Sequence, residues 1–147
     1  MRSLMAGKAL IRFVGVVERV KGETATIHIF SPYKAGLKGI EGFSHLIILF
    51  WIHQRDDKKN RSTLCVVPRR HKGSPEMGVF GTRSPSRPNP IGLSVVELEH
   101  IKGCGLTVRG LDALEGSPII DIKPYIPRAD RKFRVTVPKW TGHGPPT

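Results

Sequence analysis

Short apolar segments that end at glycine, proline or aspartate are the feature that most limits the fold of this 147-residue chain. We expect strands at residues 10–17, 24–30, 45–53, 63–67, 91–101, 106–111 and 119–123, and no helix longer than two turns. About seven short strands with glycine-rich turns favour a barrel or sandwich over a doubly wound sheet. The sequence therefore predicts a mainly all-β fold, a single compact β-barrel with short irregular or helical turns and no Rossmann unit.

Local patterns refine this expectation. Residues 10–17 and 24–30 predict a hairpin that turns at Val20–Glu23, and residues 33–42, with three glycines, predict a loop with at most one helical turn. The stretch HLIILFWIH at residues 45–53 is apolar throughout, which predicts a central strand buried on both faces. The charge run QRDDKKNR that follows it is typical of a solvated loop.

The length and the 39% hydrophobic content fit one ordinary domain with a real core. We expect a barrel domain over residues 1–127 and a basic, proline-containing tail of limited order over residues 128–147. The N-terminus lacks the pattern of a targeting peptide or a membrane span. Cys65 and Cys104 lie far apart without metal-like spacing, so we expect no metal site and no disulfide, and a reducing cytoplasm.

The charge of the chain limits its partners. Lysine and arginine total 24 against 12 acidic residues, a formal charge of +12. Such a field attracts polyanions, with nucleic acid as the leading partner, although a basic soluble protein without a specific partner has the same composition. Nucleotide-binding glycine motifs, a phosphate loop, a zinc-protease motif and a nucleophile elbow are all absent from the sequence. A nucleotide-handling function would therefore need an unconventional site.

The stretch GTRSPSRPNPIGLS at residues 81–94 is the first candidate for that site. Three prolines fix the backbone and pre-position the side chains between them, which favours ligand binding. Arg83 and Arg87 can each offer a planar fork to a carboxylate or phosphate. The competing interpretation is a stiffened turn whose arginines pair with acidic neighbours.

The stretch LDALEGSPIIDIKPYIP at residues 111–127 is the second candidate. Asp112, Glu115 and Gly116 lie on an expected tight turn that can receive an ammonium group or ribose hydroxyls, or can be a plain Asx-type turn. Asp121 and Lys123 fall on one strand face, where they form either an ion pair in a wet pocket or a surface pair. Tyr125 is either a core aromatic or a stacking surface for a base.

The blocks EGFSHLIILFWIH, GVFGTRSPSRPNPIGLSVVEL and GLDALEGSPIIDIKPYIPRAD resemble those of the TsaA-like family, also called the VirR or tRNA methyltransferase O family. The similarity runs from Gly15 to Asp130. It implies a compact β-barrel, usually a homodimer, that binds S-adenosylmethionine without a Rossmann fold. The implied reaction is N6-methylation of threonylcarbamoyl-adenosine at position 37, in the anticodon loop of tRNA.

The resemblance also implies the residues of the cofactor site. Matching positions are His53, Gln54, Arg83, Leu93, Leu114, Glu115, Gly116, Ser117 and Pro118. The chain departs from the family at Gln54, where arginine is common, and after Val17, where a longer proline- and glutamine-containing segment is reduced to ERVKGE. We expect no counterpart of the extra C-terminal domain of many bacterial members, and we therefore expect the barrel, its dimer partner and the basic tail to engage tRNA.

Four residues are candidates for substrate orientation or proton handling, with the base unassigned among them: Arg87, Asp121, Lys123 and Tyr125. Basic residues expected to contact tRNA phosphates are Arg69, Arg70, His71, Lys72, Arg128, Arg131, Lys132, Arg134 and Lys139. Two other functions fit parts of the pattern. One is a non-catalytic RNA-binding barrel, and the other is an S-adenosylmethionine-dependent methyltransferase or regulator that uses another acceptor.

Overall fold

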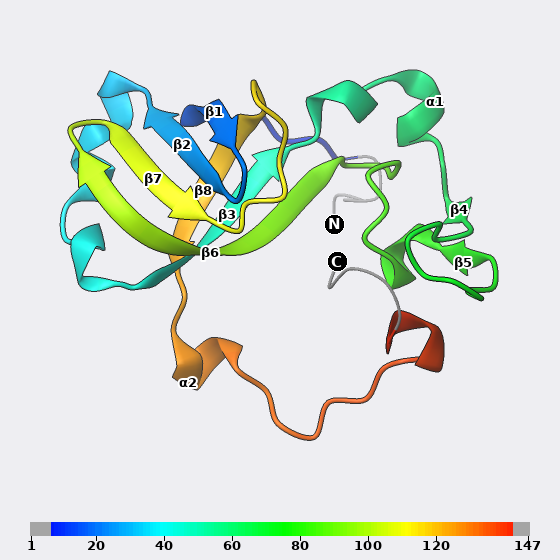
Figure 1. Cartoon of the computed structure of the whole chain (residues 1–147). Helices are drawn as coiled ribbons and strands as arrows, with labels where there is room; N and C mark the ends of the chain where they lie inside the picture. Colours follow the sequence, from blue (N-terminus) through cyan, green and yellow to red (C-terminus); the bar gives the residue numbers. More distant parts are fainter. Residues whose placement is uncertain (1–6, 143–147) are drawn as a thin grey trace, which may run out of the picture.

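The computed structural model describes residues 7–142, in which six antiparallel strands form a closed barrel in the order β1, β2, β7, β6, β3, β8 (Figure 1). These strands are β1 (Gly15–Lys21), β2 (Thr24–Ile29), β3 (His45–Trp51), β6 (Ile91–Lys102), β7 (Gly105–Arg109) and β8 (Pro118–Pro124). Closure comes from β8, which pairs with β3 along most of its length and with β1 at Gly15 and Val16. The prediction of an all-β fold without a Rossmann unit is confirmed.

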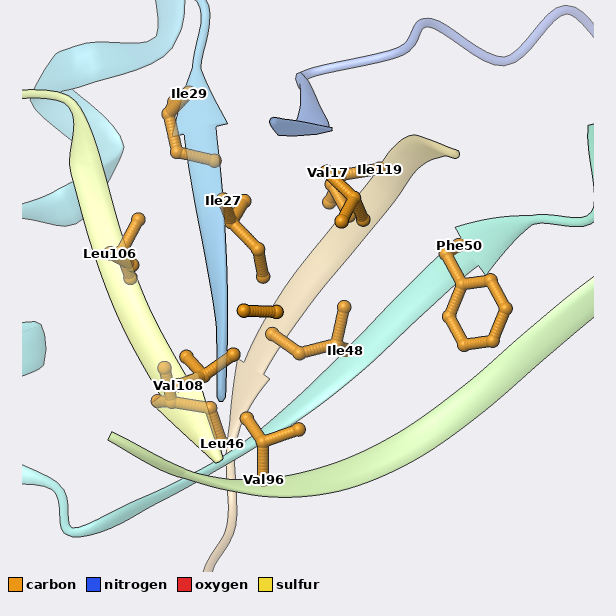
Figure 2. Close-up of a cluster of buried hydrophobic side chains, with 11 residues drawn as sticks. Val17, Ile27, Ile29, Leu46, Ile48, Phe50, Val96, Leu106, Val108 and Ile119 are labelled. Carbon is orange, nitrogen blue, oxygen red and sulfur yellow. The ribbon is translucent and has the colours of Figure 1, made fainter. Parts of the chain in front are cut away.

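Alternate residues of each strand point into the barrel and form its core (Figure 2). The most buried members include Ile27, Leu46, Ile48, Leu106 and Ile119, each with no exposed surface. β-branched and leucine side chains supply this core because they fill the interior of a small barrel and fit a pleated strand. The predicted strands at residues 24–30, 91–101, 106–111 and 119–123 are all present with small shifts of their ends.

The expectation that residues 45–53 are buried on both faces is wrong. β3 alternates between fully buried residues such as Leu46 and half-exposed residues such as Ile47 and Leu49. In a closed barrel one face of each strand points inward and the other outward, and no helix within residues 7–142 covers the outside of β3 (Figure 1). The uniformly apolar sequence therefore leaves an apolar stripe on the outer surface.

The first strand begins later than expected. Residues 10–14 lie before β1, and Leu10 is 84% exposed. β1 extends instead to Lys21, and Gly22 makes the predicted hairpin turn with a φ of +60°. Glycine adopts this left-handed conformation without the steric cost that other residues incur. At the start of β1 the backbone of β2 lies so close to Gly15 that a Cβ there would contact the His28 carbonyl oxygen.

The connections contain only short helical pieces. The segment at residues 33–42, expected to hold at most one helical turn, contains two 3₁₀ segments, η1 (Ser31–Leu37) and η2 (Ile40–Gly42). The charge run forms η3 (His53–Arg55) and helix α1 (Lys58–Arg61). The predicted strand at 63–67 shrinks to β4 (Cys65–Val66), which pairs outside the barrel with β5 (Met77–Gly78) and is followed by η4 (Val79–Gly81). We call residues 65–78 the β4–β5 arm.

After β8 the chain leaves the barrel and loops away from it before it ends beside the β4–β5 arm (Figure 1). It contains helix α2 (Pro127–Asp130) and the 3₁₀ turn η5 (Lys139–Gly142), and we call residues 127–142 the C-terminal strap. The last part of the predicted tail, residues 143–147, and the first six residues of the chain lie outside the described residues. No helix within residues 7–142 is long and apolar enough to cross a membrane.

Candidate functional site

Arg61 of α1 holds the proline-rich loop (residues 82–90) in place. Its Nε donates a hydrogen bond of 2.9 Å to the Pro88 carbonyl, and its Nη2 lies 3.4 Å from Asn89 Oδ1. Its Nη1 forms an ion pair of 3.0 Å with Asp56, and the guanidinium lies 5.5 Å from the centre of the Trp51 ring. Arg61 therefore connects the end of β3 to the loop that precedes β6.

A second set of hydrogen bonds joins α1 to the same loop. Ser86 Oγ donates to Asn60 Oδ1 over 2.6 Å, and Arg55 Nη1 lies 3.3 Å from Ser86 Oγ. Asp57 caps α1 by accepting hydrogen bonds from the Asn60 backbone and side-chain amides. These hydrogen bonds favour the charged carboxylate and hold the pKa of Asp57 below its usual value of 3.8. The charge run, expected to be a solvated loop, is thus the support of the proline-rich loop.

The two arginines of the loop differ in their surroundings. Arg87 is half-buried, and its Nη1 donates to the carbonyls of Thr82 and Ser84 at 3.1 and 3.0 Å. The sequence suggested two partners for Arg87, a ligand or an acidic neighbour. Its Nη1 instead binds two backbone carbonyls and so stabilises the loop itself. Arg83 is exposed, and within residues 7–142 no hydrogen bond or ion pair of its side chain is present. Its guanidinium fork is available for an anion.

The second candidate stretch forms a turn at the barrel end where β3 ends and β8 begins. The Ser117 amide donates to the Leu114 carbonyl and the Gly116 amide to the Val17 carbonyl. Gly116 has a φ of +88°, and a Cβ built on it would lie 4.0 Å from His53 Nε2. The predicted tight turn is therefore present, and it lies beside His53 of η3.

Glu115 faces a depression of about 400 Å³ that is also lined by Glu18, Arg19 and Thr26. One Glu115 carboxylate oxygen accepts a hydrogen bond of 3.2 Å from the Val20 amide. This depression lies at an irregularity of β1, where the pairing with β2 shifts between Val17 and Arg19. The shortened segment after the first strand is thus a bulged strand that forms one wall of the depression.

Leu93 and three other candidates lie on the outer face of β8, β3 and β6. Leu93 is opposite Leu49, which is in turn opposite Asp121, so the three residues form a row across the strands. Asp121 and Lys123 form the expected ion pair, with 3.1 Å between the charged atoms. Tyr125 is half-buried, and its ring contacts the His45 ring edge-on at 6.4 Å.

The predicted residues thus fall into three neighbouring groups. His53 and the turn that contains Leu114, Glu115, Gly116, Ser117 and Pro118 share the barrel end, together with Gln54, which is exposed on η3. Arg83 and Arg87 belong to the proline-rich loop, and Leu93, Asp121, Lys123 and Tyr125 belong to the outer face. Within residues 7–142 no cluster of three or more His, Cys, Asp or Glu side chains can hold a metal ion.

Two links between these groups were not predicted from the sequence. One is Arg61 with Asn60, hidden in a charge run that has the composition of an ordinary loop. The other is Ser94, a buried residue of β6 whose hydroxyl accepts the Asp112 amide hydrogen bond at 3.0 Å. A polar residue in line with the apolar, inward positions Val96 and Leu98 of β6 was the available signal for Ser94.

Comparison with known proteins agrees with the sequence blocks. Residues 17–131 match the family model of the tRNA-methyltransferase O N-terminal domain. An S-adenosyl-L-methionine-binding protein of Archaeoglobus fulgidus is 50% identical over 112 residues, which are 76% of each chain. The Escherichia coli tRNA (adenine(37)-N6)-methyltransferase is 44% identical over 128 residues, 83% of this chain and 52% of the enzyme.

Solved structures show the same fold. The crystal structure of TrmO from Pseudomonas aeruginosa superposes with a TM-score of 0.68 at 28% identity, covering 88% of this chain and 61% of that one. The chain spans about half the length of the E. coli enzyme, and as little as 28% of another A. fulgidus relative. The match to the family model nevertheless covers most of the barrel and all three groups of candidate residues. The chain therefore belongs to the tRNA-methyltransferase O N-terminal domain family.

Proposed function

We propose that this protein is an S-adenosylmethionine-dependent tRNA methyltransferase that methylates N6 of threonylcarbamoyl-adenosine at position 37. The observation that carries the proposal is the 44% identity to the E. coli tRNA (adenine(37)-N6)-methyltransferase over 83% of this chain. The proline-rich loop held by Arg61 and the turn beside His53 add a physical basis. We assign catalysis to the barrel of residues 1–127, tRNA contacts also to residues 128–147, and the protein to the cytoplasm.

The residues at the barrel end suit the polar groups of this cofactor. The exposed guanidinium of Arg83 can bind a carboxylate through two parallel hydrogen bonds. Glu115 uses one oxygen for the Val20 amide, and its other oxygen can accept from an ammonium group or a ribose hydroxyl. His53, Gln54, Leu93 and the turn from Leu114 to Pro118 complete the proposed binding site. When bound, the cofactor supplies an electrophilic methyl group on a sulfonium.

The protein's own contribution is orientation and removal of one proton. Methyl transfer forms a carbon–nitrogen bond at N6, breaks the sulfonium carbon–sulfur bond and releases the N6 proton with the neutral thioether. In well-oriented reactions, holding the two reactants in place lowers the activation free energy by roughly 7 to 11 kcal/mol. We assign Asp121, Lys123 and Tyr125 to substrate orientation or proton acceptance. Arg87 contributes by fixing the loop, since its Nη1 binds the carbonyls of Thr82 and Ser84.

We further propose that two copies form a homodimer through the outer face of β3 and β6. Ile91, Leu93 and Val95 are 41 to 47% exposed there, next to half-exposed Ile47 and Leu49. An apolar patch of this kind favours a protein interface. Leu93 and Asp121 lie on this open face, so the second copy would supply the missing wall of the substrate site.

The test is transfer of labelled methyl from S-adenosylmethionine to purified tRNA that carries or lacks the threonylcarbamoyl group. We expect label only in the modified tRNA. Label in neither, from folded protein that binds the cofactor, would refute this acceptor and favour a methyltransferase with a different one. Absence of cofactor binding with tRNA binding retained would favour the non-catalytic RNA-binding barrel.

A further inference from the structure

Two basic segments that are far apart in the sequence meet outside the barrel. Trp140 of the C-terminal strap contacts His71 of the β4–β5 arm edge-on, with 5.3 Å between the ring centres and 68° between the ring planes. Figure 1 shows the strap leaving the barrel after β8 and ending beside β4 and β5. Trp140 is half-buried at this contact, whereas residues 127–139 of the strap are exposed. The strap and the arm are therefore in contact through Trp140 and His71.

These two segments hold much of the chain's positive charge. Together they contain eight Lys and Arg residues and two acidic residues, so they contribute +6 of the formal +12. Asp130 accepts a hydrogen bond from the Ile126 amide within the strap. The ion pair of Arg70 with Asp112 is long, 3.6 Å, and its side chains are 60% and 54% exposed. Counting Asp112 with the two segments changes their formal charge from +6 to +5, so the surface stays strongly positive.

The strap also presents an aromatic group beside its cations. Phe133 is 75% exposed, and the Arg131 guanidinium lies 4.9 Å from the centre of its ring. Arginine stacked on an exposed aromatic ring is a common way to contact RNA bases next to phosphates. An acidic protein partner would need no such stacking surface, so the combination favours RNA.

We propose that the strap and the arm form one surface that binds the phosphate backbone of a folded RNA, and that the His71–Trp140 contact joins its two halves. This inference rests on the proposed function in taking tRNA as that RNA. Two groups of cations held at a fixed separation bind a polyanion with a smaller entropy cost than two independent segments. The surface lies outside the barrel, so its removal should weaken tRNA binding and leave cofactor binding unchanged.

The experiment measures the dissociation constant of fluorescently labelled tRNA transcript across a series of KCl concentrations. The strap variant is Arg131→Ala/Lys132→Ala/Arg134→Ala, and its control, Lys34→Ala/Lys38→Ala/Lys102→Ala, removes the same charge from exposed positions of the barrel. We expect the strap variant to reduce the slope of log affinity against log salt by about 2 to 3. The barrel control should reduce it by less than about 1. Equal slopes in the two triple variants would overturn the proposal.

The joint itself is tested with Trp140→Ala and the conservative Trp140→Phe. Loss of the contact should weaken tRNA binding about 5- to 10-fold through lost preorganisation, and phenylalanine should restore most of it. Wild-type affinity in Trp140→Ala would refute the joined surface, and so would equal affinity for tRNA and an unstructured RNA of the same length. Cofactor affinity, measured by calorimetry, should match wild type in every variant. RNA binding is measured without turnover. Failure of methyl transfer would therefore contradict the proposed reaction without affecting the result of the binding experiment.

Discussion

At the scale of single residues, Arg61 is the side chain on which the geometry of the proposed cofactor site depends. Its fork contacts the Pro88 carbonyl, Asp56 and the Trp51 ring together, a combination that lysine cannot reproduce. We expect Arg61→Ala to weaken S-adenosylmethionine binding about tenfold, and Arg61→Lys to restore little of it. The change in unfolding free energy should stay within about 1 kcal/mol, because the ion pair is exposed.

Calorimetry of cofactor binding, with thermal unfolding measured in parallel, checks this prediction. Lys59→Ala is the matched control, since Lys59 is an exposed cation on the same helix. Unchanged cofactor affinity in a folded Arg61→Ala protein would show that the loop keeps its shape without this contact.

Asp57 gives a pH-dependent prediction at the same scale. Its folded-state pKa is lowered below 3.8 by the hydrogen bonds from Asn60. The capping contribution is therefore fully present above pH 3.8 and is lost as the pH falls through the lower, folded-state pKa. An NMR titration of the Asn60 amide should show a midpoint below 3.8, and Asp57→Asn should abolish that titration. A midpoint at or above the usual value would contradict the capping geometry.

At the scale of elements, the pairing of β3 with β6 requires a residue without a side chain at Gly92. Gly92 lies opposite Phe50, and a Cβ there would overlap the Phe50 ring, which is only 6% exposed. We expect Gly92→Ala to lower the unfolding free energy by about 1 to 3 kcal/mol, the usual cost of overpacking. Denaturant unfolding measures it, with Gly36→Ala as control because nothing lies within 4 Å of a Cβ there. Equal stability of the two variants would refute this account.

Most strands of the barrel could be predicted, because each is a short apolar or alternating segment bounded by turn-forming or charged residues. The pairing of β8 with β1 and β3 could not be predicted, since it depends on the whole set of strands. For the site, too, residues in distinctive local stretches could be predicted, and residues that act through distant contacts could not. Gly116 and Arg83 stand in distinctive local stretches, whereas Arg61 acts through contacts with residues 27 and 28 positions away. A charge run has the same composition whether it is solvated or supports a loop.

At the scale of the whole molecule, the proposed homodimer gives a reason for the apolar outer face of β3. Val95→Asp places a charge on the outer face, where it should leave the barrel folded and convert the proposed dimer to a monomer. Sedimentation velocity measures this change, and Leu10→Asp is the control because Leu10 is exposed and precedes the first strand. Cofactor and tRNA affinities of the monomer would show whether the second copy completes the site. A monomeric wild type would refute the dimer.

The way in which the barrel closes has a consequence for its synthesis. β8 is the last strand to leave the ribosome, and it alone lies between β1 and β3. Until it emerges, both of those strands have an unpaired edge, and the apolar β3 sequence is exposed on a nascent chain that cannot yet finish folding. The ladder between β8 and β1 has two residue pairs, Gly15 with Ile119 and Val16 with Pro118, and backbone hydrogen bonds of Val14 and Val17 extend it at its ends. A ribosome that stalls before residue 118 would therefore hold an open sheet whose unpaired edges can aggregate. This protein should depend on chaperones most at that stage of translation.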